Sequence, residues 1–349
     1  MSIPINQKDF ILVAGCPRSG TYLLSSLLSK HLNIVFPLET HIIYLLRNRI
    51  HLWGDLNIYQ NRKNLLTDIY SFLGIWLKKG MKLDEKALPY SLLSTKTMRE
   101  KILYNANTFE IIIHNLYREY AKNHQADYYG EKSVPFWHIP LEELQQQIPN
   151  LKVIHIIRDG RDVYLSWGKT WFGSSCLYEA TKTWAEHLNL KRSWGKKNSE
   201  KYLELKYEDL LANTDFEIER ISEFLNINKT QKANITHSDG IADLAAGKGH
   251  HDLLSEDVVT SNFNKWKKSM TPSDRMFFEY IAGDVLSKFM YEVENKKISH
   301  IDLIRFNLKI LYSKCLIFFS FTNFKRRIKS ILPILIFYSR KFGIVSSKD

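Results

Sequence analysis

A continuous apolar run that leads directly into a glycine-containing loop is the feature that most constrains this chain. The run FILVAG, residues 10–15, has no polar alternation, which is typical of a strand buried on both faces of a parallel sheet. The segment GCPRSGTYLLSSLLSKH overlaps its end and continues with apolar residues at helical spacing. The order of strand, loop and helix predicts a phosphate-binding loop at the carboxyl end of a buried strand.

This loop differs from the loop of nucleotide triphosphatases at two positions. In the pattern G-x-x-x-x-G-K-[ST], the lysine contacts phosphates and the hydroxyl holds Mg²⁺, but Thr21 and Tyr22 stand at these positions here. Backbone N–H groups at a helix N-terminus still favour an anion, and an arginine adds a permanent, planar cation. We therefore expect a phosphate to be held without a metal, by Arg18, Ser19, Gly20, Thr21 and Tyr22. The alternative is an ordinary strand-to-helix turn with an exposed arginine.

A second strand, loop and helix follow in LKVIHIIRDGRDVYLSW, residues 151–167. Arg158 stands where the strand ends, and Ser166 lies one to two turns into the helix. Both side chains can therefore contact a second phosphate at the carboxyl edge of the sheet, where ligands of such sheets bind. Alternatively, Arg161 and Asp162 pair locally and only shape a charged turn.

The rest of the chain continues the alternation of strands and helices. Residues 202–206 read as a strand, and residues 42–125 read as mostly helical. A helix is expected from Pro272, with Thr271 as its cap. The alternation predicts an α/β fold, with a P-loop-type parallel sheet flanked by helices. We expect one domain over residues 1–295, with a helical acceptor region at about 42–125, and a basic amphipathic extension over residues 296–349.

The composition narrows the class of protein. The chain has 349 residues and a net charge of +12, and residues 298–349 alone hold ten Lys or Arg against two Asp. The remainder is mildly basic and has no nucleic-acid-binding motif, so we expect no nucleic-acid partner. The three cysteines are distant and odd in number, which argues against a disulfide framework or a structural zinc. No basic stretch with a long apolar run opens the sequence, so we expect a cytoplasmic protein.

The two loops and two further segments of the sequence resemble those of one enzyme family. PRSGTYLL followed by IIRDGRDVYLSW resembles the sulfotransferases that use 3′-phosphoadenosine 5′-phosphosulfate (PAPS). KYEDLLANTDFEIERISEFLNI resembles the family's Tyr-Glu-Asp segment, and NKWKKSMTPSDRMFFEYIAGDVLSKFMYE resembles its closing Lys-Trp segment and helix. The resemblance covers residues 8–293 in pieces and is closest to the tyrosylprotein and carbohydrate branches. Residues 42–125 match nothing in it.

The resemblance implies a binding site for the donor PAPS. The first loop corresponds to the segment that binds the 5′-phosphosulfate, and Arg158 with Ser166 corresponds to the segment that binds the 3′-phosphate. Tyr207 matches a tyrosine that lines the nucleotide site, although a core tyrosine beneath the sheet is the alternative. Lys265 matches a lysine that reaches the donor's phosphates. A donor without a triphosphate and Mg²⁺ also explains why the loop lacks its lysine.

The resemblance also implies the catalytic residues. Sulfuryl transfer needs a base for the acceptor hydroxyl and positive charge beside the transferring group. Glu39, in IVFPLETHII, corresponds to the family's base, with His31 and His41 as alternative bases and a carboxylate at a helix N-terminus as the structural alternative. Lys132, in YYGEKSVPFWH, corresponds to a lysine near the donor's bridging oxygen, unless it is a surface lysine on a loop. Arg18 and Lys132 then stabilise the transferring group.

Two segments lie outside these motifs. AAGKGHHDL, residues 245–253, is glycine-rich and basic, and we expect it to form a lid over the nucleotide. Its adjacent histidines lack supporting ligands, so we expect no metal site. The basic extension interleaves aromatic and aliphatic residues with Lys and Arg, and its uncharged runs are too short to span a bilayer. We expect it to contact an anionic membrane surface; packing on the domain or on a second subunit is the alternative.

These observations predict a PAPS-dependent sulfotransferase whose acceptor hydroxyl belongs to a glycan, a lipid or a peptidyl tyrosine. A P-loop kinase or NTPase is a second hypothesis, but it requires a lysine after Gly20 and an acidic residue that holds a metal. A third hypothesis is a nucleotide-regulated, membrane-associated scaffold without catalysis. Glu39→Ala distinguishes the scaffold from the enzyme, because only the enzyme has turnover to lose.

Overall fold

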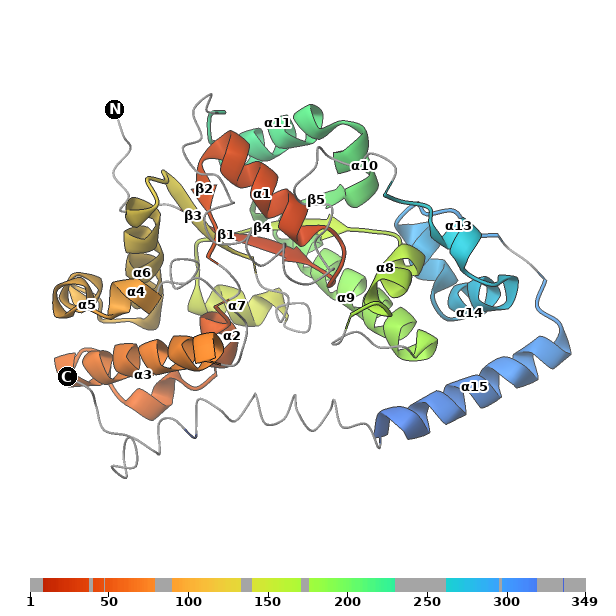
Figure 1. Ribbon diagram of the computed structural model, residues 1–349, viewed down its shortest axis with the longest axis horizontal. Helices are drawn as coiled ribbons and strands as arrows, with labels where there is room; N and C mark the ends of the chain where they lie inside the picture. Colours follow the sequence, from red (N-terminus) through yellow and green to blue (C-terminus); the bar gives the residue numbers. More distant parts are fainter. Residues whose placement is uncertain are drawn as a thin grey trace.

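A five-stranded parallel sheet organises the chain in its computed structural model (Figure 1). The strands are β1 (Phe10–Gly15), β2 (Ile34–Val35), β3 (Tyr128–Lys132), β4 (Leu151–Ile157) and β5 (Tyr202–Lys206). Their spatial order is β2-β3-β1-β4-β5, so β1 lies at the centre, buried along its whole length. The strands predicted at residues 10–15 and 202–206 are confirmed. The structure describes residues 9–37, 40–46, 48–78, 90–132, 140–170, 176–229, 262–294, 297–318 and 335.

Helices cover both faces of this sheet, as the α/β prediction required (Figure 1). On one face, α1 (Thr21–Leu32), α10 (Tyr207–Ala212) and α11 (Thr214–Leu225) pack over Ile11 and Val13 of β1. On the other face, α6 (Phe109–Asn123) packs over Phe10 and Leu12. Alternate residues of β1 therefore serve two separate hydrophobic cores, which explains why its sequence is apolar throughout.

The chain changes direction between β1 and β4. From β1 it crosses one face through α1 and builds β2 and β3 on one side, whereas β4 and β5 lie on the other side of β1. The connection after β4 runs through α8 (Gly160–Trp167) and α9 (Leu177–Lys197), on the face opposite α1 (Figure 1). The two connections therefore diverge at the carboxyl ends of β1 and β4, the position where open α/β sheets bind ligands.

The segment between β2 and β3 is helical, as predicted for residues 42–125. It contains α2 (Ile42–Leu46), a 3₁₀ turn (Ile50–Trp53), α3 (Tyr59–Lys78), α4 (Tyr90–Leu93) and α5 (Lys96–Leu103) before α6. Its apolar residues join the core beneath Phe10 and Leu12. The helical region is therefore packed on the sheet and forms one wall of the same body.

The C-terminal helices extend this body on the side of β5. They are α13 (Trp266–Ser269), α14 (Pro272–Lys288) and α15 (His300–Phe318). A further short helix, α7 (Leu141–Gln147), precedes β4 in the middle of the chain. The Thr271 side chain accepts a hydrogen bond from the N–H of Asp274 at 3.1 Å, which confirms the predicted cap.

Within the described part of the chain, no helix combines the length and apolarity needed to cross a membrane. The basic extension beyond α15 lies outside the described residues, apart from Leu335.

The sequence analysis did not predict β2 and β3. β2 has two residues, which is too short for a recognisable pattern. β3, with the sequence YYGEK, ends in two charged residues that resemble a solvent-exposed turn, yet Glu131 and Lys132 are buried. Gly130 allows β3 to lie against β1, because a Cβ there would lie 2.4 Å from the carbonyl oxygen of Ile11.

Candidate functional site

The two predicted phosphate loops meet at the carboxyl ends of β1 and β4. These strands are paired with Gly15 opposite Ile156, so the loops that follow them lie side by side at one edge of the sheet. The Arg18 Nε donates a hydrogen bond to Ser166 Oγ at 3.0 Å. Nη1 of Arg158 donates to the carbonyl oxygen of Arg18 at 3.1 Å. The structure therefore brings together three residues that the sequence assigned to one donor.

The backbone of the first loop depends on Gly20. This residue has φ +94°, in the left-handed region that glycine favours, and a Cβ there would lie 2.4 Å from Cδ2 of Tyr207. Helix α1 begins at the next residue, Thr21, with no acidic side chain in its first turn and no side-chain cap among the described residues. A helix N-terminus of this kind favours an anion.

Arg158 is held between the ring of Tyr207 and a segment near residue 262. Its guanidinium carbon lies 4.3 Å from the centroid of the Tyr207 ring. Its Nη2 donates to the carbonyl oxygen of Asn262 at 2.6 Å, and the Asn262 amide donates to the Tyr207 hydroxyl at 2.9 Å. Tyr207 is therefore buried against the predicted phosphate ligand Arg158. Sequence reasoning missed Asn262, because no motif marks it and its partners lie far away in the chain.

The electrostatics at these two loops favour an anion. Burial lowers the pKa of Arg18, and the positive charge of Arg158 lowers it further. Two like charges at close range are costly in a partly desolvated site unless an opposite charge joins them. In addition, Ser19 Oγ and Arg158 Nε are buried without a hydrogen-bond partner in the part of the chain that the structure describes. These unsatisfied groups fit a ligand rich in phosphate oxygens.

Lys132 lies at the end of β3, on the other side of β1 from Arg158. Lys132 is only 7% exposed, and its Nζ lies 5.7 Å from the centroid of the Tyr22 ring. Lys132 is opposite Val13 in the sheet register, two residues before the first loop. The alternative of an exposed surface lysine is therefore wrong, and a third cation stands beside the first loop.

A buried cluster of oxygens lies next to Lys132. Glu131 is fully buried, and its Oε2 accepts hydrogen bonds from the Tyr117 hydroxyl and, at 3.2 Å, from Thr40 Oγ1. The hydroxyls of Thr40 and Tyr117 are themselves 2.9 Å apart. These hydrogen bonds connect Tyr117 of α6 and Glu131 of β3 to Thr40, the residue that follows Glu39.

The structure describes the positions of some of the remaining predicted residues but not of others. Glu39 lies outside the described residues, so its role as base stays a prediction. His31 occupies the last turn of α1, about 15 Å from the first loop at 1.5 Å per residue, which argues against it as the base. Lys265 is exposed just before α13, and the next N–H, that of Trp266, donates to Asp162 Oδ1 at 2.9 Å. The segment that carries Lys265 is therefore attached to α8, the helix of Ser166.

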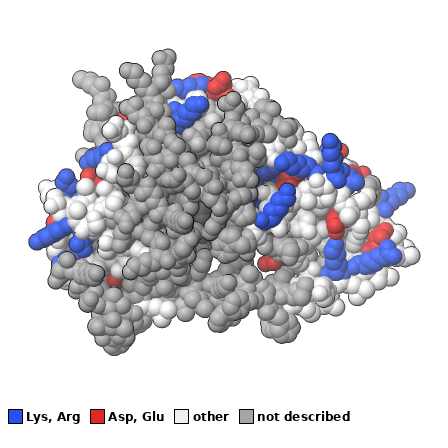
Figure 2. Space-filling model, in the orientation of Figure 1, with Lys and Arg blue, Asp and Glu red and all other residues white. Residues whose placement is uncertain are grey.

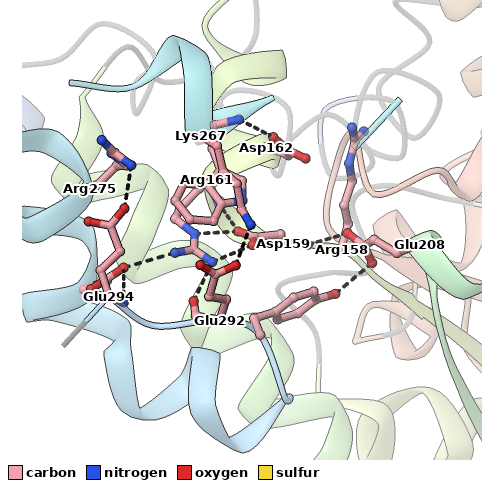
Figure 3. A network of polar contacts seen from close by, with 12 residues as sticks. Arg158, Asp159, Arg161, Asp162, Glu208, Lys267, Arg275, Glu292 and Glu294 are labelled. Atoms are coloured by element: carbon pink, nitrogen blue, oxygen red, sulfur yellow. Dashed lines mark hydrogen bonds and ion pairs between the residues drawn. The ribbon is translucent and has the colours of Figure 1, made fainter. Parts of the chain in front are cut away.

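Arg161 has a structural environment that differs from the local pair considered above (Figure 3). Its guanidinium is fully buried and binds Asp159 at 2.7 Å and Glu279 of α14 at 3.1 Å, while Asp162 instead accepts the Trp266 N–H. It also stacks at 3.5 Å on the centroid of the Trp266 ring. The expected pairing of Arg161 with Asp162 is wrong in its partner, because the N-cap position of α8 belongs to Asp159.

Comparison with known proteins agrees with this geometry. The sequence model of the sulfotransferase family matches residues 10–231. The sulfotransferase domain of the olefin synthase of Synechococcus PCC 7002 has a similar fold, with a TM-score of 0.57 and 18% identity, over 82% of this chain and 98% of that chain. A sulfotransferase domain of the curacin biosynthetic pathway gives a TM-score of 0.51 and 16% identity, over 82% and 99%. No curated protein sequence matches the chain. Because the family match spans more than half of its residues, including both predicted phosphate loops, the chain belongs to the sulfotransferase family.

Proposed function

We propose that the protein transfers a sulfuryl group from PAPS to an acceptor hydroxyl. The observation that carries this proposal is the contact between the two arginine loops, in which Arg18 binds Ser166 and Arg158 binds the backbone of Arg18. PAPS has one anionic group at each end of its ribose, and the loops supply one cationic site for each. The family membership supports assigning the 5′-phosphosulfate to the β1 loop and the 3′-phosphate to Arg158 and Ser166.

The residues present fit this donor. The unsatisfied Ser19 Oγ and Arg158 Nε would gain phosphate oxygens as partners. Thr21 and Tyr22 replace the lysine and the metal-holding hydroxyl of an ATP loop, which disfavours a kinase or NTPase. When bound, PAPS supplies the sulfuryl group and leaves as 3′,5′-ADP.

The chain's own residues would then position and stabilise the reaction. Arg18 lies in the first loop and Lys132 beside it, where negative charge would build on the leaving oxygen of the donor in a loose transition state. Glu39 would accept the proton of the acceptor hydroxyl. The buried cluster of Thr40, Tyr117 and Glu131 supports this assignment, because it anchors the residue that follows Glu39.

The donor is tested by thermal unfolding with 3′,5′-ADP and, separately, with ATP and Mg²⁺. A ligand at about 100 times its Kd stabilises the folded state by roughly 2.7 kcal/mol, so 3′,5′-ADP should raise the midpoint in the wild type. Arg158→Gln should lose most of this shift, whereas Lys267→Gln, at an exposed ion pair on α13, should keep it. A shift with ATP and Mg²⁺ alone would contradict the donor assignment.

Catalysis is tested separately from binding. Purified protein is incubated with cell extract and PAPS labelled in its sulfuryl group, and the glycan, lipid and protein fractions are separated. Labelling of one fraction identifies the acceptor class. Glu39→Gln should bind 3′,5′-ADP like the wild type but lose labelling, whereas a non-catalytic scaffold shows no labelling with either protein. Near-full labelling by Glu39→Gln would reassign the base.

A further inference from the structure

Helix α15 carries apolar side chains on two opposite sides. On the inner side, Phe306 is 3% exposed and packs on α14, with ring centroids 5.1 Å from Phe277 and 5.4 Å from Tyr280. Lys309 Nζ binds Asp274 Oδ1 of α14 at 2.9 Å. These contacts fix which side of α15 faces the body.

The opposite side has a row of exposed apolar residues. These residues, which we call the outer stripe, are 60–65% exposed: Ile301, Ile304, Leu308, Leu311 and Tyr312. Their spacing places them within about 100° of arc on one side of the helix, and that side is about 180° from Phe306. Single exposed apolar residues are normal on a protein surface, but a continuous row along three turns indicates a binding surface.

Basic residues border the outer stripe. On a helical wheel, Arg305 lies at one edge and Lys314 lies beyond the other, and both are exposed. The 31 residues that follow α15, residues 319–349, add seven Lys or Arg and one Asp. Lys and Arg side chains are also frequent on the neighbouring surface at the end of the molecule that α13, α14 and α15 form, with acidic residues between them (Figure 2). The described surface around the stripe therefore carries many cations, with acidic residues between them, and the segment that follows α15 in the sequence is basic.

We propose that the outer stripe docks on an anionic phospholipid surface, with α15 lying in the plane of the headgroups. An apolar row bordered by cations suits such a helix, because its side chains enter the acyl boundary while the basic residues meet lipid phosphates. A second copy of this chain is a less suitable partner, since two such stripes would bring their like-charged borders together. The inner contacts with α14 would hold the catalytic body against the bilayer.

The test is sedimentation of the full chain with vesicles. Wild-type protein should sediment with phosphatidylcholine vesicles containing about one third phosphatidylserine, should bind pure phosphatidylcholine weakly, and should dissociate as salt is raised. Ile304→Glu combined with Leu308→Glu should lower binding at least tenfold. A matched control is Tyr104→Glu combined with Phe216→Glu, which places the same charges at exposed aromatic positions on α11 and after α5, and it should bind like the wild type. Unfolding midpoints should stay unchanged in both, because the four positions are exposed.

Three outcomes would overturn the proposal. The first is wild-type protein that binds neither kind of vesicle. The second is an Ile304→Glu, Leu308→Glu variant that binds anionic vesicles as tightly as the wild type. The third is a wild-type dimer in sedimentation velocity that the same variant converts to a monomer while vesicle binding is absent; this result would assign the stripe to a second copy. Arg305→Gln with Lys314→Gln provides an independent variant, which should weaken binding to anionic vesicles only.

Discussion

Replacing Arg161 should destabilise the fold more than replacing any exposed cation around it. The guanidinium is fully buried, and its two carboxylate partners, Asp159 and Glu279, have side chains only 6% and 9% exposed. It also donates to the carbonyl oxygen of Glu292 at 2.7 Å. Arg161→Ala removes the fully buried cation of this network (Figure 3) and leaves the buried carboxylates of Asp159 and Glu279 without it.

The magnitude follows from this burial. Breaking a buried ion pair by removing one partner costs about 3–5 kcal/mol, because the remaining charge stays desolvated. The whole free energy of unfolding of a natural domain is about 5–15 kcal/mol. Lys267→Ala is the matched control, since Lys267 binds Glu292 in the same segment but the two side chains are 44% and 59% exposed. An exposed pair contributes about 0–1 kcal/mol, so the control should change little.

The assay is urea unfolding followed by circular dichroism and tryptophan fluorescence. With a slope of about 3 kcal/mol per molar urea, Arg161→Ala should lower the midpoint by about 1 M or more, and Lys267→Ala by a few tenths at most. Arg161→Met combined with Glu279→Gln should recover part of the loss, since one stranded charge is then removed. If Arg161→Ala unfolds at the same urea concentration as Lys267→Ala, the argument from buried charge is wrong. If Arg161→Ala does not fold, the same measurement is made on Arg161→Lys, which keeps the positive charge.

Further predictions concern the site and the pH dependence of stability. Gly20→Ala should weaken 3′,5′-ADP binding, and calorimetric titration of a variant that also carries Tyr207→Leu should show partial recovery, because the smaller side chain removes the 2.4 Å contact. Arg158→Lys should bind 3′,5′-ADP at least tenfold more weakly by titration, since an ammonium cannot form the same fork. Tyr117→Phe should lower kcat more than it lowers 3′,5′-ADP affinity, because it loosens Thr40 and not the donor loops. Burial lowers the pKa of Lys191 to about 7, against the raising effect of Glu142 and Glu143. The unfolded chain therefore binds more protons above pH 7, and the free energy of unfolding should rise from pH 7 to 9 in the wild type but less in Lys191→Met.

The sequence predicted the elements that leave a local pattern. Continuous apolar runs identified β1 and β4, and Pro272 with Thr271 identified the start of α14. The two loops were recognisable because glycine and arginine stand at fixed offsets from those strands. The family assignment followed from the same short segments, so the fold could be expected from the sequence, whereas the placement of the donor site stays a prediction.

What the sequence could not predict depends on distant partners. Residues 128–132 end in Glu131 and Lys132, which look solvated until α6 and Thr40 supply the hydroxyls around the carboxylate. Asn262 has no motif, and its two partners in the site come from the ends of β4 and β5. The alternative of a local pair between Arg161 and Asp162 named the wrong partner. Arg161 binds Asp159 within the same segment, and it also binds Glu279, which lies 118 residues later and reaches it only through the packing of α14 on α8.

Arg158 and Arg161 lie three residues apart but have different surroundings, which supports the proposed binding role of Arg158. Arg161 is buried among carboxylates, so its charge is already neutralised within the fold. The hydrogen bonds of Arg158 go to carbonyl oxygens, and among the described residues it forms no ion pair, although it is 6% exposed. The charge of Arg158 interacts with the carboxylates of Asp162 and Glu208, but its hydrogen bonds go to carbonyl oxygens, so a bound anion would neutralise it further. The RDGRD sequence presents both arginines alike, whereas their hydrogen-bond acceptors differ, and this difference supports our proposal that Arg158 binds the donor.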